Sequence, residues 1–240
     1  MATFVLVHGG GHGGWCYNRV SRLLRAAGHE VYVPTLTGLG ERKHLLNPDI
    51  DLQTHITDLL NLIQFNDLDN ILLVGHSYGG MVITGVADQM RERIRHLIYL
   101  DAAHPENGQS LADVTPEIMA MAQSELRNIN GVELVLFPDS QAIRYLGVTN
   151  PTDFAWMQSK ITPHPWKCFT QKLQLEDESA VRRIPRTNIN CSSSLAMSSN
   201  EKRARQTDGD HLYEIDTGHD LMITEPVKVA AMLLEVAALR

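Results

Sequence analysis

Short hydrophobic runs alternate with helical patterns along the chain. Six runs have the length and the aliphatic composition of buried strands, at residues 4–8, 31–35, 71–75, 97–101, 187–191 and 211–215. Between the second and third runs, apolar side chains recur at helical spacing and predict a helix over 51–66: Leu52, Ile56, Leu59, Leu60 and Ile63. This alternation predicts an α/β fold, a mostly parallel central sheet with helices on both faces, in one domain of residues 1–240.

Two further segments complete the predicted architecture. A last helix is expected near the C-terminus, with Thr224 as its N-cap and Pro226 in its first turn. From about residue 104 to 184 strand signals are few and helix formers are many, which predicts a helical cap inserted between two strands of the sheet. The cap carries large side chains, some of which should line a cavity between cap and sheet: Met119, Met121, Phe137, Phe154, Trp156, Met157, Trp166 and Phe169.

The third strand leads directly into a chemically informative turn. Residues 75–79 read Gly-His-Ser-Tyr-Gly, and a helical stretch follows from Met81 to about Met90. A strand, a sharp turn with the pattern Gly-x-Ser-x-Gly and a helix form a nucleophile elbow, which presents the serine hydroxyl beside the free N–H groups of the helix start. Only small residues at Gly75 and Gly79 allow strand and helix to approach so closely. Ser77 is therefore the candidate nucleophile.

Composition narrows the possible partners. The chain has 240 residues, 43% of them hydrophobic, and a net charge of -7. With no long basic run, nucleic acid and anionic membranes are not expected partners. The short basic cluster Lys202, Arg203 and Arg205 is expected on a solvated helix face. No oligomeric state is indicated.

Targeting and metal signals are also missing from the sequence. We expect no leader segment and no membrane span, and hence a soluble, cytoplasmic protein. Three scattered cysteines (Cys16, Cys168 and Cys191) predict buried free thiols, with no disulfide framework and no metal spacing. No cofactor is expected.

Four motifs in a fixed order carry a resemblance that covers essentially the whole chain. They are VHGGGHGGW at 7–15, GHSYGG at 75–80, YLDAAHP at 99–105 and TGHD at 217–220. The chain resembles the α/β-hydrolase superfamily, in particular small bacterial esterases related to plant methylesterases and hydroxynitrile lyases. That branch includes enzymes that hydrolyse pyrethroid esters and benzimidazole carbamates, and LTGLGER at 36–42 adds to the likeness with the carbamate-hydrolysing type.

The resemblance implies partners for the serine. A hydroxyl needs a base to take its proton, and in this fold the base follows the last strand, where His219 stands. The negative oxygen of a tetrahedral intermediate needs preorganised donors. One is the backbone N–H of Tyr78, just after the nucleophile; by resemblance the other is the N–H of Gly10. The alternative interpretation of the glycine-rich segment is a phosphate-binding loop. The segment lacks the Gly-Lys-[Ser/Thr] ending of a P-loop, which argues against that interpretation.

The acid that should orient His219 is not at its usual place. The family sets it about three residues past the strand that ends at Cys191, which is Ser194 here, and residues 192–199 contain no carboxylate. Asp101, at the end of the preceding strand, and Glu201, after the serine-rich loop, are the two candidates. A Ser–His dyad assisted by water or by serine hydroxyls is the third possibility.

The reaction expected from these residues is acyl transfer to water. A serine at position 77 argues against the dehalogenases and epoxide hydrolases of this fold, which use aspartate there. Asp220 and Gly10 stand where related lyases have lysine and threonine. We therefore expect a carboxylesterase-type serine hydrolase that cleaves a small to medium apolar ester or carbamate. The alternative is a non-catalytic receptor that binds a ligand in the same cavity.

Overall fold

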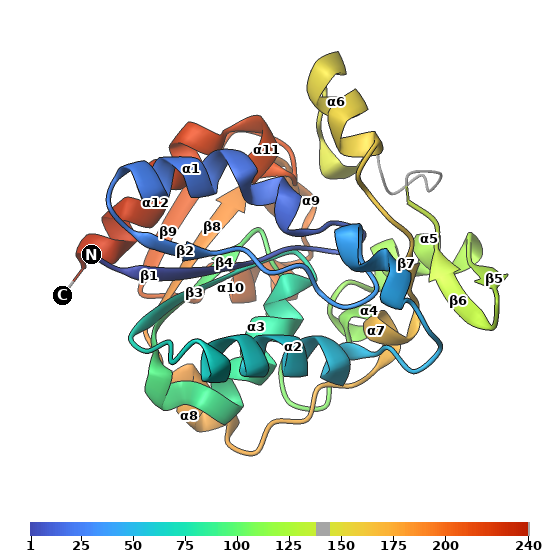
Figure 1. Ribbon diagram of the computed structural model, residues 1–240, viewed down its shortest axis with the longest axis horizontal. Coiled ribbons are helices and arrows are strands. Elements are labelled where there is room, and N and C mark those ends of the chain that lie inside the picture. Colours follow the sequence, from blue (N-terminus) through green and yellow to red (C-terminus); the bar gives the residue numbers. More distant parts are fainter. Residues whose placement is uncertain (138–144, 240) are drawn as a thin grey trace.

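A six-stranded sheet forms the centre of the protein, in the order β2-β1-β3-β4-β8-β9 (Figure 1). The computed structural model describes residues 1–137 and 145–239. In these ranges every neighbouring pair of this sheet is parallel, as the strand–helix alternation predicts. The strands are β1 (Thr3–Val7), β2 (Glu30–Tyr32), β3 (Ile71–His76), β4 (Ile94–Leu100), β8 (Arg186–Cys191) and β9 (His211–Ile215).

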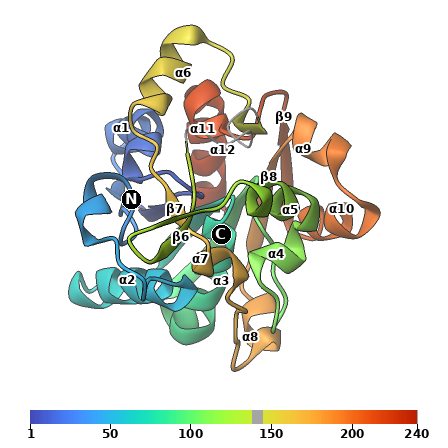
Figure 2. The same cartoon turned by 90° about the vertical axis from the view of Figure 1, so that its right-hand side faces the viewer.

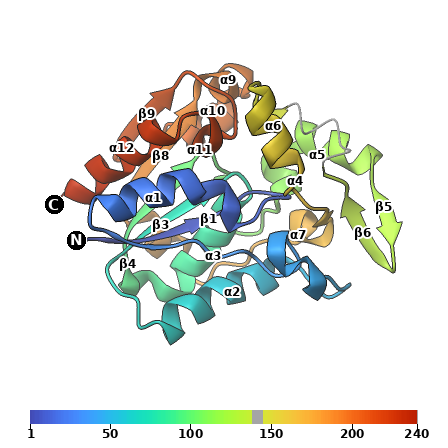
Figure 3. The same cartoon turned by 45° about the horizontal axis from the view of Figure 1, so that its top comes forward.

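Helices cover both faces of this sheet (Figures 1 and 3). One face carries α1 (Asn18–Ala26), α11 (Leu221–Thr224) and α12 (Pro226–Ala238), and the other α2 (Leu52–Phe65), α3 (Gly79–Met90) and α8 (Glu178–Arg182). Two short helices, α9 (Ser192–Met197) and α10 (Asn200–Gln206), join β8 to β9. The predicted α/β fold class is confirmed. The N-terminus and the C-terminal end of α12 lie at the end of the sheet opposite the cap (Figure 1).

Each face of the sheet has its own hydrophobic core. One core joins β1 and β3 to α2 and α3, and the other joins the opposite faces of the same strands to α1 and α12. All six residues of β3 are buried, which explains why its sequence is a continuous apolar run and not an alternating one. Each fully buried Leu or Ile contributes about 1.5–3 kcal/mol to folding. The three cysteines are free and buried, as predicted.

The start of the last helix differs from the prediction. Thr224 is not the N-cap of α12, because it is the last residue of α11, and Glu225 precedes Pro226. The Thr224 hydroxyl bonds the backbone oxygen of Asp220 at 3.3 Å and the hydroxyl of Thr217 at 2.7 Å. Its side chain therefore closes the short helix before α12, and so it is not available to cap the next one.

The segment between β4 and β8, up to α7 (Lys167–Thr170) and in its described residues, lies beyond the C-terminal ends of the strands, and α8 then returns to a face of the sheet (Figures 1 and 2). Before α8, this segment holds the helices α4 (Leu111–Val114), α5 (Pro116–Ser124), α6 (Pro151–Gln158) and α7. It also holds a small antiparallel sheet of β5 (Arg127–Ile129), β6 (Val132–Val135) and β7 (His164–Pro165). We propose that this segment is the cap insertion, about residues 104–184, of a single domain.

Besides its helices, the cap contains a small sheet that was not predicted from the sequence. Strands β5 and β6 are joined by Asn130 and Gly131, whose φ angles are 53° and 83°. Two consecutive positive φ values are those of a type I′ turn, for which Asn-Gly is the preferred pair because it matches the twist of a hairpin. The Asn-Gly pair is therefore a local sequence signal of this hairpin.

Candidate active site

The turn after β3 has the backbone of a nucleophile elbow. Ser77 has a φ of 53°, in the left-handed region that non-glycine residues rarely adopt. The close approach of strand and helix requires both flanking glycines, because a Cβ on Gly75 would lie 2.7 Å from Gly79 O and one on Gly79 would lie 2.8 Å from Val7 O. The strained geometry presents Ser77 at the C-terminal end of β3, on the side of the cap.

The predicted reactive groups line one cavity beneath the cap. Its empty volume is about 790 Å³, and its lining includes Ser77, Tyr78, His219, Asp101 and Gly10. These residues come from four loops, which follow β1, β3, β4 and β9. All four strands are parallel, so their C-terminal ends meet at one edge of the sheet, where ligands of open α/β folds bind.

Asp101 is the carboxylate that meets the imidazole of His219. Its Oδ2 lies 2.5 Å from His219 Nδ1. The same oxygen accepts a bond from the hydroxyl of Ser194 at 2.6 Å, and Oδ1 accepts the backbone N–H of Cys191 at 3.1 Å. Burial alone would raise the pKa of Asp101, but the bonds from His219, Ser194 and Cys191 outweigh it and lower this pKa to about 2. Asp101 is therefore ionised at neutral pH.

The other carboxylates near the site have different partners. Glu201 is on α10 and bonds Arg205 Nη2 at 2.7 Å, with a side chain 79% exposed. Asp220 follows His219 directly in the sequence and is buried. Its Oδ2 nevertheless lies 3.0 Å from His12 Nε2. Of the two acids predicted as alternatives, the structure thus brings Asp101 to His219 and leaves Glu201 on the surface.

The N–H groups of the two predicted oxyanion donors have no hydrogen-bond acceptor among the described residues. In residues 1–137 and 145–239, neither the N–H of Gly10 nor that of Tyr78 donates to another backbone or side-chain acceptor of the protein. Both residues line the cavity beside Ser77. Phe169 lies against Gly10, since a Cβ there would be 3.1 Å from Phe169 Cζ. The missing side chain therefore gives the loop room under the cap.

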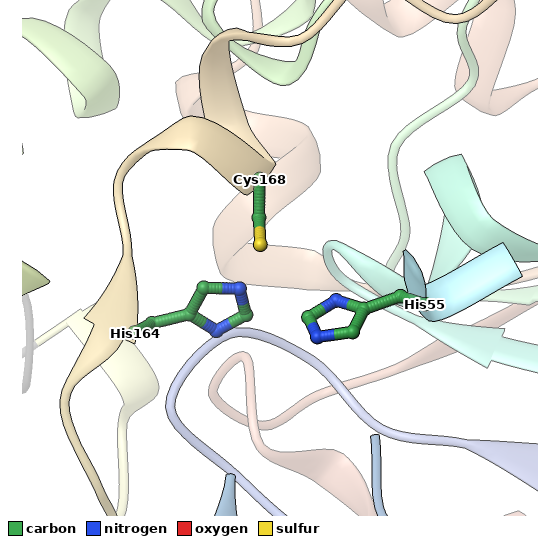
Figure 4. A group of neighbouring side chains, drawn as sticks. All are labelled: His55, His164 and Cys168. Carbon is green, nitrogen blue, oxygen red and sulfur yellow. The ribbon is translucent and has the colours of Figure 1, made fainter. Parts of the chain in front are cut away.

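One group of buried side chains has the residue types of a metal site. Potential ligand atoms of His55, His164 and Cys168 lie within 4.8 Å of one another (Figure 4). However, His55 Nε2 donates to Thr37 O at 2.9 Å, so its Nδ1 accepts the Tyr78 hydroxyl at 2.9 Å. The Cys168 thiol donates to Ile50 O at 3.9 Å.

The third member of the group, His164, already accepts a hydrogen bond at one of its two ring nitrogens. The backbone N–H of Gly11 donates to His164 Nδ1 at 3.1 Å. In a neutral ring the proton is then on Nε2, the nitrogen that faces Cys168 (Figure 4), and a protonated nitrogen cannot bind a metal. Within the described residues His164 Nε2 has no hydrogen-bond partner. Because this nitrogen carries the proton of the neutral ring and both nitrogens of His55 are already bonded, the residues do not fit a metal ion.

The cavity wall is mostly apolar and comes largely from the cap. Of the large cap residues singled out in the sequence, Met119, Phe137 and Phe169 line it. Lys202 lines it too, and burial lowers the pKa of this ammonium group. The expectation that Lys202 lies on a solvated helix face is therefore wrong, because the first turn of α10 packs against the cavity. No sequence pattern distinguishes it from its exposed neighbour Arg203.

These features have the form of a hydrolase site, and sequence comparison decides the family. The sequence model of the alpha/beta hydrolase family matches residues 4–232. The chain belongs to the α/β-hydrolase family. In the part of the chain that the structure describes, no helix is long and apolar enough to cross a membrane.

Two similar proteins are esterases by name. A carbendazim hydrolyzing esterase from Nocardioides sp. (strain SG-4G) is 56% identical over 119 residues, 50% of this chain and 49% of that protein. The match thus spans about half the length of this relative. Methylesterase 7 of Arabidopsis thaliana is 26% identical over 249 residues, 98% of this chain and 95% of the relative.

Solved structures share the fold over nearly the full length. An extracellular alpha/beta-hydrolase from a Paenibacillus species superposes with a TM-score of 0.78 at 22% identity, covering 98% of both chains. A pyrethroid hydrolase from Sphingobium faniae JZ-2 has a TM-score of 0.72 at 19% identity, with 98% of this chain and 97% of the other covered. At these identities the likeness establishes the common fold.

Proposed function

We propose that this protein is a carboxylesterase-type serine hydrolase that cleaves a small to medium apolar ester or carbamate through an acyl-enzyme on Ser77. The observation that carries the proposal is the hydrogen bond of 2.5 Å between Asp101 and His219 Nδ1, in a cavity that Ser77 also lines. With Nδ1 bonded to the carboxylate, Nε2 is the ring nitrogen left to act as a base. Asp101 stabilises the imidazolium that forms and is not itself protonated.

The proposed reaction has two halves. Ser77 Oγ attacks the carbonyl carbon while His219 Nε2 takes its proton, and the carbonyl oxygen becomes an anion that the N–H groups of Gly10 and Tyr78 stabilise. Collapse breaks the bond to the leaving alkoxide, which receives the proton from His219. Water then attacks the acyl carbon while His219 Nε2 takes its proton, and collapse of the second tetrahedral intermediate breaks the bond to Ser77 Oγ, which receives that proton as the acid is released. These steps need no cofactor.

The apolar cavity supports a substrate with a hydrophobic body. The relative that is named for carbendazim hydrolysis, 56% identical over half of this chain, supports carbamates among the candidates. A panel of apolar esters and methyl carbamates, compared by kcat/KM, tests this. A preference for strongly charged esters over apolar ones would contradict the substrate class.

Labelling tests the nucleophile. We expect a fluorophosphonate to add one equivalent to the wild-type protein, seen by intact mass, and the adduct to be absent from Ser77→Ala. Ser179→Ala is the matched control, because Ser179 is an exposed residue on α8 and bonds Asp177. A Ser77→Ala protein that hydrolyses p-nitrophenyl acetate at the wild-type rate would refute the proposal.

The receptor alternative rested on the lack of a carboxylate at residues 192–199. The contact of Asp101 with His219 removes that reason, because the imidazole has an acid partner from another loop. Failure of the wild-type protein to react with the fluorophosphonate, together with tight binding of an uncleaved ester, would favour the receptor.

A further inference from the structure

Two buried histidines hold the peptide unit that joins Gly10 to Gly11. The carbonyl oxygen of this peptide, Gly10 O, lies 2.7 Å from His12 Nδ1. Its N–H, on Gly11, donates to His164 Nδ1 at 3.1 Å. His12 belongs to the same loop, whereas His164 comes from strand β7 of the cap. The peptide is therefore held at both of its polar ends, from two distant parts of the chain.

The two bonds require opposite protonation at the same ring atom. A carbonyl oxygen only accepts, so His12 Nδ1 must carry a proton; a backbone N–H only donates, so His164 Nδ1 must be unprotonated. The surroundings supply this difference. Burial lowers the pKa of His12, but the Asp220 carboxylate 3.0 Å from its Nε2 outweighs burial and raises it. Burial, together with nearby His55 and His8, lowers the pKa of His164 well below its usual value.

The preceding peptide is held in a related way. Gly9 O lies 2.9 Å from His8 Nδ1, while His8 Nε2 accepts the backbone N–H of Leu36 at 3.1 Å. His8 is thus a neutral ring that donates from Nδ1, and burial lowers its pKa to about 3. The carbonyl of the Gly9–Gly10 peptide points to this ring, which leaves the opposite end of the same peptide, the N–H of Gly10, for the cavity.

A glycine-rich loop needs such restraints. Glycine has no Cβ and populates positive and negative φ almost equally, and Gly11 has a φ of 72°. Without fixed partners the Gly10–Gly11 peptide could rotate and redirect the neighbouring N–H. An oxyanion donor is effective only if it is already aimed at the position where the charge develops.

We propose that His12 and His164, in opposite protonation states, clamp the Gly10–Gly11 peptide and so aim the N–H of Gly10 at the oxyanion. Both are positioning residues, because they act through the loop and not on the substrate. The clamp rests on the proposed function for its catalytic consequence. It also makes the cap part of the catalytic centre: His164 stacks on Phe169, with ring centroids 4.3 Å apart, and Phe169 lies against Gly10.

The kinetic test compares two variants at position 164, one whose side chain can accept the hydrogen bond from Gly11 N–H and one whose side chain cannot. Asn can place an amide oxygen where Nδ1 accepts from Gly11, whereas Leu cannot. Removal of an oxyanion donor typically costs about 10²–10³ in kcat. In His164→Leu the Gly10 N–H would be misaligned and not removed, so we expect a smaller loss, about 10-fold in kcat per titrated active site. KM should be nearly unchanged, and His164→Asn should recover most of the loss in kcat.

A merely structural role would give a different pattern. Affinity for a trifluoromethyl ketone, which forms a tetrahedral oxyanion on the serine, should fall in His164→Leu in parallel with kcat/KM, while affinity for the corresponding alcohol should not. His96→Leu is the matched control: His96 is also buried, but it is on β4 and bonds Thr187 away from the loop. Equal kcat and equal ketone affinity in His164→Leu and the wild type would overturn the proposal.

Ring protonation can be read without any hydrolysis. In long-range ¹H–¹⁵N spectra at neutral pH, we expect His164 to carry its proton on Nε2 alone and His12 to be protonated at both nitrogens, with signals assigned by their loss in His164→Asn and His12→Gln. A protonated Nδ1 on His164, or an unprotonated Nδ1 on His12, would overturn the clamp. Failure of Ser77 labelling would instead refute the proposed function, so the two failures are distinguishable.

Discussion

The hydroxyl of Ser194 lies 2.6 Å from Oδ2 of Asp101. Ser194 stands where the sequence resemblance places the acid of the site, whereas Asp101 is at the end of the preceding strand in the sheet, β4. The two side chains therefore meet beside His219 Nδ1 from the segments that follow two adjacent parallel strands, β4 and β8. A carboxylate from either position could serve that imidazole, and here the hydroxyl of Ser194 supports the carboxylate of Asp101.

We therefore expect that the acid of the site can be relocated from position 101 to position 194 by substitution. In Asp101→Ser/Ser194→Asp, a carboxylate returns to the same location from the other strand, and we expect at least about a 10-fold higher kcat than in Asp101→Ser alone. Ser194→Asp by itself is the control and should lose stability, because two carboxylates would share one site. A double variant no better than Asp101→Ser would show that position 194 cannot present an acid to His219.

Asp101→Asn tests the role of the charge. An amide keeps the size of the side chain but favours the wrong tautomer of the imidazole, and in serine proteases such a change lowers kcat about 10⁴-fold. We expect a loss of about 10³–10⁴ in kcat here, measured per folded molecule with p-nitrophenyl butyrate. Glu201→Gln, which alters only an exposed pair with Arg205, should stay within about twofold. Similar losses in both variants would contradict the assignment.

Stability should fall as the solution becomes mildly acidic. Six histidines have pKa values lowered by burial, to about 3 for His8 and His76 and about 4 for His96 and His104, with His55 and His164 also lowered. Between the lowered value and 6.5 the unfolded chain binds more protons, so stability is lost as pH falls below 6.5. Each such proton contributes a slope of about 1.4 kcal/mol per pH unit.

Urea unfolding between pH 4.5 and 7.5 measures this slope. His12 has the opposite sign: its raised pKa stabilises the fold below pH 6.5, and that contribution is lost as pH rises through the raised value. His96→Gln should reduce the slope of the unfolding free energy against pH by the equivalent of up to one proton. The reason is that the variant lacks a ring whose pKa differs between the folded and the unfolded protein. A free energy of unfolding that is independent of pH from 4.5 to 6.5 would contradict the neutral state of these rings.

Lys202 should favour substrates that carry a hydrogen-bond acceptor. It lines a mostly apolar cavity, and a hydrogen bond to a charged donor is worth about 1.5–3 kcal/mol, or about 10-fold or more in binding. We expect Lys202→Met to lower the ratio of kcat/KM for p-nitrophenyl 4-oxopentanoate to that for p-nitrophenyl pentanoate. Lys228→Met, on α12 beside Glu225, is the control. An unchanged ratio would show that Lys202 does not contact the acyl chain.

Local sequence patterns predicted most of the architecture. The strand starting at Ile71, the glycines around Ser77 and the helix after it are set by interactions between near neighbours, so hydrophobic periodicity and glycine spacing reveal them. The hairpin at Asn130 and Gly131 has an equally local signal, although the expected helical cap did not include it. The helix start at Pro226 was predicted correctly, but its capping by Thr224 was wrong because Thr224 closes the preceding helix.

The sequence by itself determined the parallel sheet, the position of the elbow and the histidine after the last strand. Only the tertiary structure decided that Asp101 and not Glu201 meets His219, that Lys202 faces the cavity, and that His164 of the cap reaches the loop at Gly11. The reason is physical. Side chains more than a hundred residues apart meet because of strand order and cap packing, and neither leaves a periodic trace at the residues that come into contact.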